Sequence, residues 1–105
     1  ATALHLSASQ GYTTIVNRLI EKGAEVDKAN KHGITPLLVA AAQGRNEAVL
    51  ALIEKGAIVN QANKDGLTPL HAAALNGHTE IVLALIENEF QRKGLREVAQ
   101  ASIKK

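Results

Sequence analysis

The chain has 105 residues, of which 46% are hydrophobic, and its 12 Lys and Arg nearly balance its 10 Asp and Glu. This length suits one modest domain over residues 1–105 and excludes a large second one. The absence of cysteine rules out a disulfide framework and a thiolate zinc site, so we expect an intracellular, cytoplasmic setting. The longest apolar runs, such as 37–42, are too short to span a membrane.

A repeat of 33 residues organises the chain. The segments Thr-Ala-Leu-His, Thr-Pro-Leu-Leu and Thr-Pro-Leu-His begin at residues 2, 35 and 68, and Gly11, Gly44 and Gly77 keep the same spacing. A fixed period of this length is typical of solenoids, in which neighbouring units share one core. We expect units at about 1–30, 31–63 and 64–90.

Each unit is predicted to begin with a short helix. Thr35 and Thr68 suit the N-cap, and the proline that follows each of them suits the first helical position, where the missing N–H costs nothing. His5 and His71 stand three residues after a threonine, so their imidazoles should bond back to its hydroxyl in a local variant of the capping box.

A second helix should follow the glycine of each unit, since the apolar residues after it recur at helical spacing. Asn46 and Thr79 are expected to cap these helices, and Lys22 and Lys55 to lie at the ends of two of them. The polar links at 26–33 and 59–66 each end in a glycine that can supply positive φ. We predict that these links project as hairpin-like loops.

The period, the Thr-Pro-Leu-His box, the alanine pair after it, the interhelical glycine and the Gly-Ala-x-Val-Asn/Asp ending together resemble the ankyrin repeat over about residues 1–88. The resemblance implies an all-α solenoid of helix-turn-helix units with projecting hairpin-like loops. A tetratricopeptide array would instead need a 34-residue period and bulky aromatic residues, which this sequence lacks.

The two ends depart from the repeat pattern. The first unit lacks its preceding loop and has Ala3 where proline is expected, which suggests that Ala1 is an excision point in a longer array. After the third unit, a short C-terminal helix at about 94–105 is expected to cover the last repeat. Its predicted apolar face consists of Leu95, Val98, Ala99 and Ile103.

The titratable residues do not form a recognisable catalytic arrangement. His5 and His71 could in principle bind a metal or act as bases, but a full repeat separates them, which favours the capping role. Asp27 and Asp65, the two aspartates, are interpreted as turn formers rather than as a catalytic pair. Since no phosphate loop, nucleotide fingerprint or Ser-His-Asp arrangement is present either, we expect no enzyme activity, no metal and no cofactor.

Lysines in the predicted loops raise the question of what the chain binds. Lys28, Lys31 and Lys64 would make one edge of the solenoid basic. Nucleic acid is the less favoured partner, because Tyr12 and Phe90 are the only aromatic residues and cannot form a stacking platform. We expect another protein with an acidic patch instead, with neither nucleic acid nor membrane involved.

The resemblance also implies a contact surface made of the loop tips and the exposed, concave side of the first helices. Ile34, Leu67 and Leu75 are apolar at positions where partial exposure is expected, although inter-repeat packing is an equally open interpretation of Ile34 and Leu67. We expect a monomeric, non-catalytic interaction module; the alternative is a structural spacer within a larger enzyme or effector. The candidate contact residues are Ser9, Gln10, Lys31, His32, Ile34, Ala42, Gln43, Lys64, Asp65, Leu67, Leu75 and Asn76.

Overall fold

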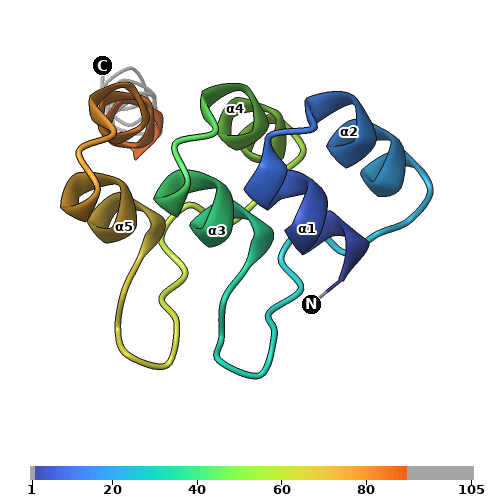
Figure 1. Ribbon diagram of the computed structural model, residues 1–105, viewed down its shortest axis with the longest axis horizontal. Coiled ribbons are helices and arrows are strands. Elements are labelled where there is room, and N and C mark those ends of the chain that lie inside the picture. Colours follow the sequence, from blue (N-terminus) through green and yellow to red (C-terminus); the bar gives the residue numbers. More distant parts are fainter. Residues whose placement is uncertain (1, 90–105) are drawn as a thin grey trace, which may run out of the picture.

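Short helices alternate between two rows in the computed structural model, which describes residues 2–89 (Figure 1). The described residues contain helices and turns but no strand, so the predicted all-α, helix-turn-helix solenoid is confirmed. One row holds the first helices, α1 (Ala3–Gln10), α3 (Pro36–Ala42) and α5 (Pro69–Leu75). The other row holds α2 (Thr13–Glu21), α4 (Asn46–Glu54) and the helical residues 79–89.

The first helices begin as predicted, each at a threonine. Thr35 Oγ1 accepts a hydrogen bond from the backbone N–H of Leu38 at 3.2 Å. In the other two units the capping is reciprocal, because His5 and His71 bond back to their threonines through Nδ1. These caps depend on residues only three positions apart, and their roles are therefore encoded locally.

The second helices begin differently from the prediction. The expected cap at Asn46 is wrong, because Asn46 is the first helical residue of α4 and Arg45 occupies the N-cap without a side-chain capping bond. Thr79 likewise lies within the helical residues 79–89 rather than before them. The Asn46 amide instead donates to Glu80 Oε2 in the next unit at 2.6 Å. The C-terminal ends agree better, since Lys22 and Lys55 occupy the C-cap positions of α2 and α4.

The core runs continuously between the two rows. Small side chains, such as the fully buried Ala40 and Ala73, lie in the first helices, where α3 packs against both α1 and α5. Larger residues, such as Leu37 and Leu52, fill the space between the rows. Small residues let the first helices approach closely, and bulkier residues behind them form one core that neighbouring units share.

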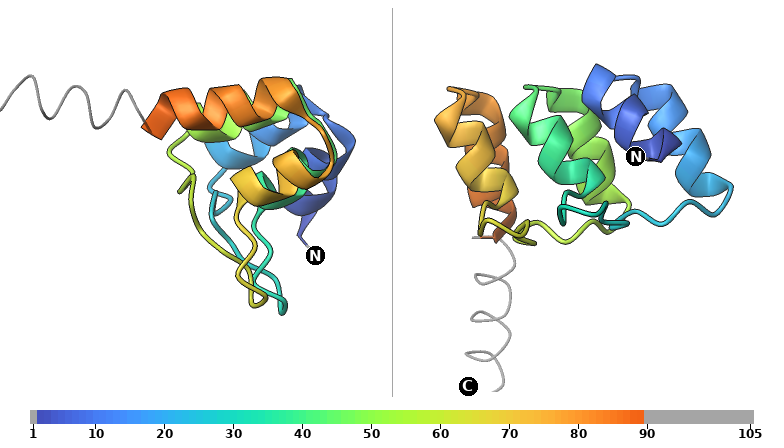
Figure 2. Two further views of the ribbon diagram at one scale, coloured as in Figure 1. Left: turned by 90° about the vertical axis from the view of Figure 1, so that its left-hand side faces the viewer. Right: turned by 60° about the horizontal axis from the view of Figure 1, so that its bottom comes forward.

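The predicted loops are present and project away from the helices (Figure 2). Each closes like a hairpin, with Asn30 N–H donating to Ile34 O at 3.0 Å and Asn63 N–H donating to Leu67 O at 2.9 Å. Gly33 supplies the tight turn with φ of +78°. The C-terminal helix expected at about 94–105 lies outside the described residues.

Candidate functional site

The twelve candidate contact residues fall into two rows at opposite ends of the first helices. A first helix lies between the two rows, and a helix of seven residues is about 10 Å long at the usual rise. The loop-tip row consists of Lys31, His32, Ile34, Lys64, Asp65 and Leu67. The helix-end row consists of Ser9, Gln10, Ala42, Gln43, Leu75 and Asn76.

Backbone contacts hold the two loops against each other. The N–H of Lys64 donates to the carbonyl of His32 at 3.0 Å, which joins neighbouring loop tips directly. Within one loop, Asn63 Oδ1 accepts from the backbone N–H groups of Asp65 and Leu67. A Cβ on Gly33 would lie only 3.0 Å from Lys64 N, so this approach of the two backbones requires glycine. The chain's own backbone and side-chain contacts therefore hold the loop tips in place.

Side chains of the loop-tip row are mostly accessible. Lys31, His32, Lys64 and Asp65 are exposed. Ile34 and the equivalent leucine at 67 are half-buried, so each is partly covered by the stack and partly exposed to solvent, and their role in contacting a partner stays a prediction. Two of the four exposed side chains, Lys31 and Lys64, are lysines against the single acid Asp65, and they give the row a net positive charge.

The helix-end row contains one strongly exposed apolar side chain. Leu75 is 76% exposed and is the most exposed large hydrophobic residue among those that the structure describes. Ser9 and Ala42, which stand at the same repeat position, are half-buried, while the neighbouring amide side chains of the row are exposed. Asn76 is partly engaged, because its Nδ2 donates to the carbonyl of Ala42 at 3.0 Å. This row therefore offers one apolar anchor beside hydrogen-bonding amides.

One set of inter-repeat contacts was missed by sequence reasoning. Arg45 Nε donates to the carbonyl of Ser9 at 2.9 Å, and His78 Nε2 donates to the carbonyl of Ala42 at 3.1 Å. These two side chains stand 33 residues apart and perform the same task in successive units. The 33-residue period relates these two positions. The arginine and the histidine, however, share no motif that would have predicted the contact. The His78 side chain is half-buried as a result of its contact.

Asp27 and one of the two capping histidines, His5, also connect units. Asp27 Oδ1 accepts from the N–H of Ile58, 31 residues later, at 2.9 Å. His5 Nε2 donates to the carbonyl of Ile34 at 2.8 Å, in addition to its local bond with Thr2. Sequence reasoning found the local roles of these residues and missed the second contact of each.

Some exposed apolar side chains lie outside the two candidate rows. Leu6 on α1 is 62% exposed, whereas at the same repeat position Val39 is half-buried and Ala72 is buried. Leu50 and Leu83, one repeat apart, are exposed on the second row of helices. The 33-residue period identifies these positions as equivalent. It does not indicate which of the equivalent side chains a neighbouring unit covers.

The site is otherwise simple in its chemistry. Within residues 2–89 no group of three or more His, Asp or Glu lies close enough together to hold a metal ion. Of the helices that the structure describes, none has the length and apolar character needed to cross a membrane. The two rows supply cations, amides and an apolar anchor, groups suited to forming ion pairs, hydrogen bonds and apolar contacts with another surface.

These features define a class of protein, a solenoid of stacked helix-turn-helix repeats with projecting loops. The family model for ankyrin repeats, in three copies, matches residues 4–94, and the chain belongs to this family. Ankyrin repeats generally serve as protein–protein interaction modules. A protein of Rickettsia bellii (strain RML369-C), described as an ankyrin repeat protein, is 47% identical over 36 residues, which is 34% of this chain. The matched segment spans 15% of that relative's length.

Proposed function

We propose that the chain is a non-catalytic module that binds another protein through the loop-tip row and the helix-end row together. The observation that carries the proposal is the combination of an exposed apolar anchor, Leu75, with exposed cationic loop tips on one stacked scaffold. A few anchor side chains commonly supply most of the binding energy at an interface, with polar groups around them.

The charges of the loop-tip row favour an acidic partner surface. Lys31 and Lys64 are exposed and one repeat apart, and the bond between the two loops keeps their backbones in register. Partner carboxylates would meet these ammonium groups mainly during the encounter, so the association rate should fall as salt screens the attraction. Asp65, the single acid of the row, would partly offset this attraction to an acidic surface.

The rigidity of the loops supports binding by a preformed surface. Both loops are closed internally by the Asn30 and Asn63 side chains and are joined to each other by the Lys64–His32 bond. Because the loops are already ordered, binding a partner costs little of their conformational entropy. This improves the affinity for a given contact area.

The test is affinity capture from cell extract with three forms of the chain, followed by titration of any captured protein. The binding-face variant is Lys31→Glu, Lys64→Glu, Leu75→Asp. The matched control, Lys22→Glu, Lys55→Glu, Leu50→Asp, introduces the same changes on exposed positions outside the two rows. Circular dichroism and thermal melting establish that both variants are folded.

We expect the parent and the control to retain a partner and the binding-face variant to lose it. Removing anchors worth about 2 kcal/mol or more weakens binding by about 30-fold or more in titration. Equal retention by all three forms would contradict the proposed face. A parent that retains no protein would instead favour the spacer alternative.

A further inference from the structure

The second row of helices carries one surface pattern in two successive units. An exposed leucine has an exposed glutamate three residues before it and another four residues after it, so the three side chains share one stripe along the helix. The same stripe recurs 33 residues later. We call the six side chains the back surface: Glu47, Leu50 and Glu54 on α4, and Glu80, Leu83 and Glu87 on the next helix of the row.

The two stripes lie side by side. α4 and the helical residues 79–89 are neighbours in the second row (Figure 1), and the bond from the Asn46 amide to Glu80 Oε2 at 2.6 Å joins them. Packed helices lie about 8–10 Å apart. The two leucines therefore form a line across the helices, and at the usual helical rise a line of glutamates runs about 5 Å to one side and about 6 Å to the other.

The back surface combines apolar exposure with negative charge. Leu50 is 54% exposed and Leu83 is 56% exposed. A single exposed leucine is ordinary on a protein surface, but here two successive units repeat both the exposure and the flanking acids. Segments 46–55 and 79–89 contain one basic residue, Lys55. Nucleic acid and an anionic membrane would be repelled, so the surface favours an occupant with apolar side chains between cations.

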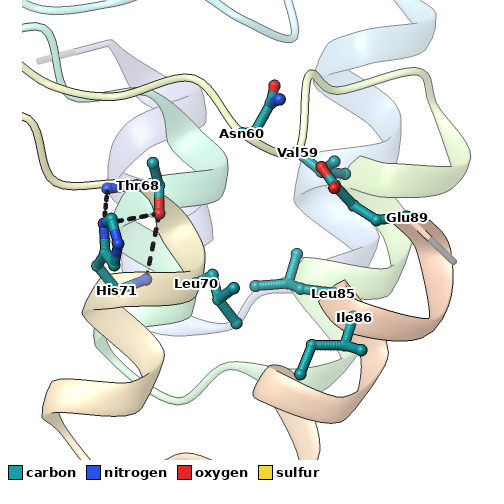
Figure 3. A pocket seen from close by; sticks show the side chains of 8 residues that line it. All are labelled: Val59, Asn60, Thr68, Leu70, His71, Leu85, Ile86 and Glu89. Carbon is teal, nitrogen blue, oxygen red and sulfur yellow. Dashed lines mark hydrogen bonds between the residues drawn. The ribbon is translucent and has the colours of Figure 1, made fainter.

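The back surface is separate from the other sites of the molecule. Neither candidate row includes any of its residues. The helix that carries Leu83 also lines an open cavity of about 360 Å³, but it does so through Leu85, Ile86 and Glu89 (Figure 3). An occupant of the back surface therefore leaves both candidate rows free, and the inference goes beyond the proposed function without resting on it.

We propose that the back surface binds a basic amphipathic helix of another protein, which lies across α4 and the helical residues 79–89. Two turns of a helix rise about 10.5 Å, close to the spacing of packed helices, so apolar side chains seven residues apart would contact Leu50 and Leu83. Lysine and arginine on both sides of that apolar stripe would meet the glutamates, while their alkyl stems lie along the leucines. With the two rows also occupied, the chain would hold two proteins at once.

A synthetic peptide tests the proposal, and the chain suits fluorescence titration because it contains no tryptophan. The probe is a leucine–lysine peptide of about 18 residues, or five helical turns, with a single tryptophan in its leucine stripe. Burial of this tryptophan shifts its emission to shorter wavelength. A peptide of the same composition in scrambled order lacks the stripe, and we expect it to bind at least about tenfold more weakly. Equal affinities would reduce the interaction to net charge and overturn the proposal.

Substitutions of exposed leucines locate the binding surface. Leu50→Gln, Leu83→Gln should weaken binding of the probe by about tenfold or more. The matched control, Leu6→Gln, Leu75→Gln, changes exposed leucines of the first helices and should leave Kd unchanged. Circular dichroism establishes that both variants are folded. Because the control alters the anchor of the helix-end row, failure of this inference and failure of the proposed function are distinguishable. Equal Kd values for the parent and the Leu50, Leu83 variant would overturn the proposal.

The flanking carboxylates are tested in the same titration. Glu47→Gln, Glu87→Gln should weaken binding and reduce its dependence on salt, whereas Glu21→Gln, Glu25→Gln, at exposed positions of the first unit, should change neither. The same loss from both variants would show that only the total charge matters and would contradict the assignment.

Methyl NMR gives an independent readout on the unsubstituted chain. The probe should shift the methyl resonances of Leu50 and Leu83 and leave those of Leu6 and Leu75 in place. Shifts confined to the first helices would overturn the proposal. The alternative occupant is a second copy of the chain: if the back-surface resonances shift on raising the concentration of the chain alone, copies of the chain cover this surface, and the proposal is likewise overturned.

Discussion

Gly44 and Gly77 occupy the same turn in successive units and differ in what lies beside them. Both have φ of +73°. A Cβ on Gly44 would lie 2.7 Å from Cε1 of His78, whereas a Cβ on Gly77 would meet nothing within 4 Å in the described part of the chain. Alanine at either position therefore forces a left-handed backbone, but only at Gly44 must a neighbouring side chain also move.

The expected losses of stability follow from the left-handed backbone at both sites and from the displaced imidazole at Gly44. The left-handed conformation costs an alanine about 1–2 kcal/mol at either site. At Gly44 the imidazole must also give up the bond from His78 Nε2 to the carbonyl of Ala42, worth about 1 kcal/mol. Gly44→Ala should thus lose about 2–3 kcal/mol and Gly77→Ala about 1–2 kcal/mol. For a domain of this size the difference corresponds to about 4–8 °C in Tm.

Urea denaturation and thermal melting, each followed by circular dichroism, measure the difference. A His78→Ala background supplies the control, because it removes the side chain that the new methyl group would meet, and the two glycine substitutions should then cost the same. Equal losses for Gly44→Ala and Gly77→Ala in the parent chain would show that the contact with His78 adds nothing to the cost.

Two further predictions concern side chains that satisfy backbone groups. Asp27→Ala should lower the free energy of unfolding by about 1 kcal/mol, since it removes the acceptor of the Ile58 N–H, while Asp65→Ala at the exposed loop tip should change it by less than about 0.5 kcal/mol; equal effects in urea denaturation would contradict the inter-unit role of Asp27. Thr35→Ala should cost about 1 kcal/mol by leaving the Leu38 N–H without its cap. Thr35→Ser should retain most of the stability in the same assay, and a serine variant as unstable as the alanine variant would argue against capping.

The candidate site was predictable in part. The period located the loop tips, and the positions of Lys31, Lys64 and Leu75 on the unit indicated accessible side chains, which the structure places as exposed. The half-buried state of Ile34 could not be predicted, because it depends on how closely one loop lies against its neighbours. Whether these residues bind a partner stays a prediction until the capture experiment is done.

Short-range interactions encode the helix starts and the turns directly in the sequence. A threonine whose hydroxyl accepts the backbone N–H three residues later caps each first helix, with a reciprocal histidine in two of the three units, and glycine supplies the positive φ of the turns. The contacts between units, such as those from Arg45, His78 and Asp27 to backbone groups more than 30 residues away, depend on tertiary stacking. Side chains of different chemistry can make such contacts, because stacking brings the same backbone groups to the same place in every unit. A pattern of residue types therefore does not reveal them.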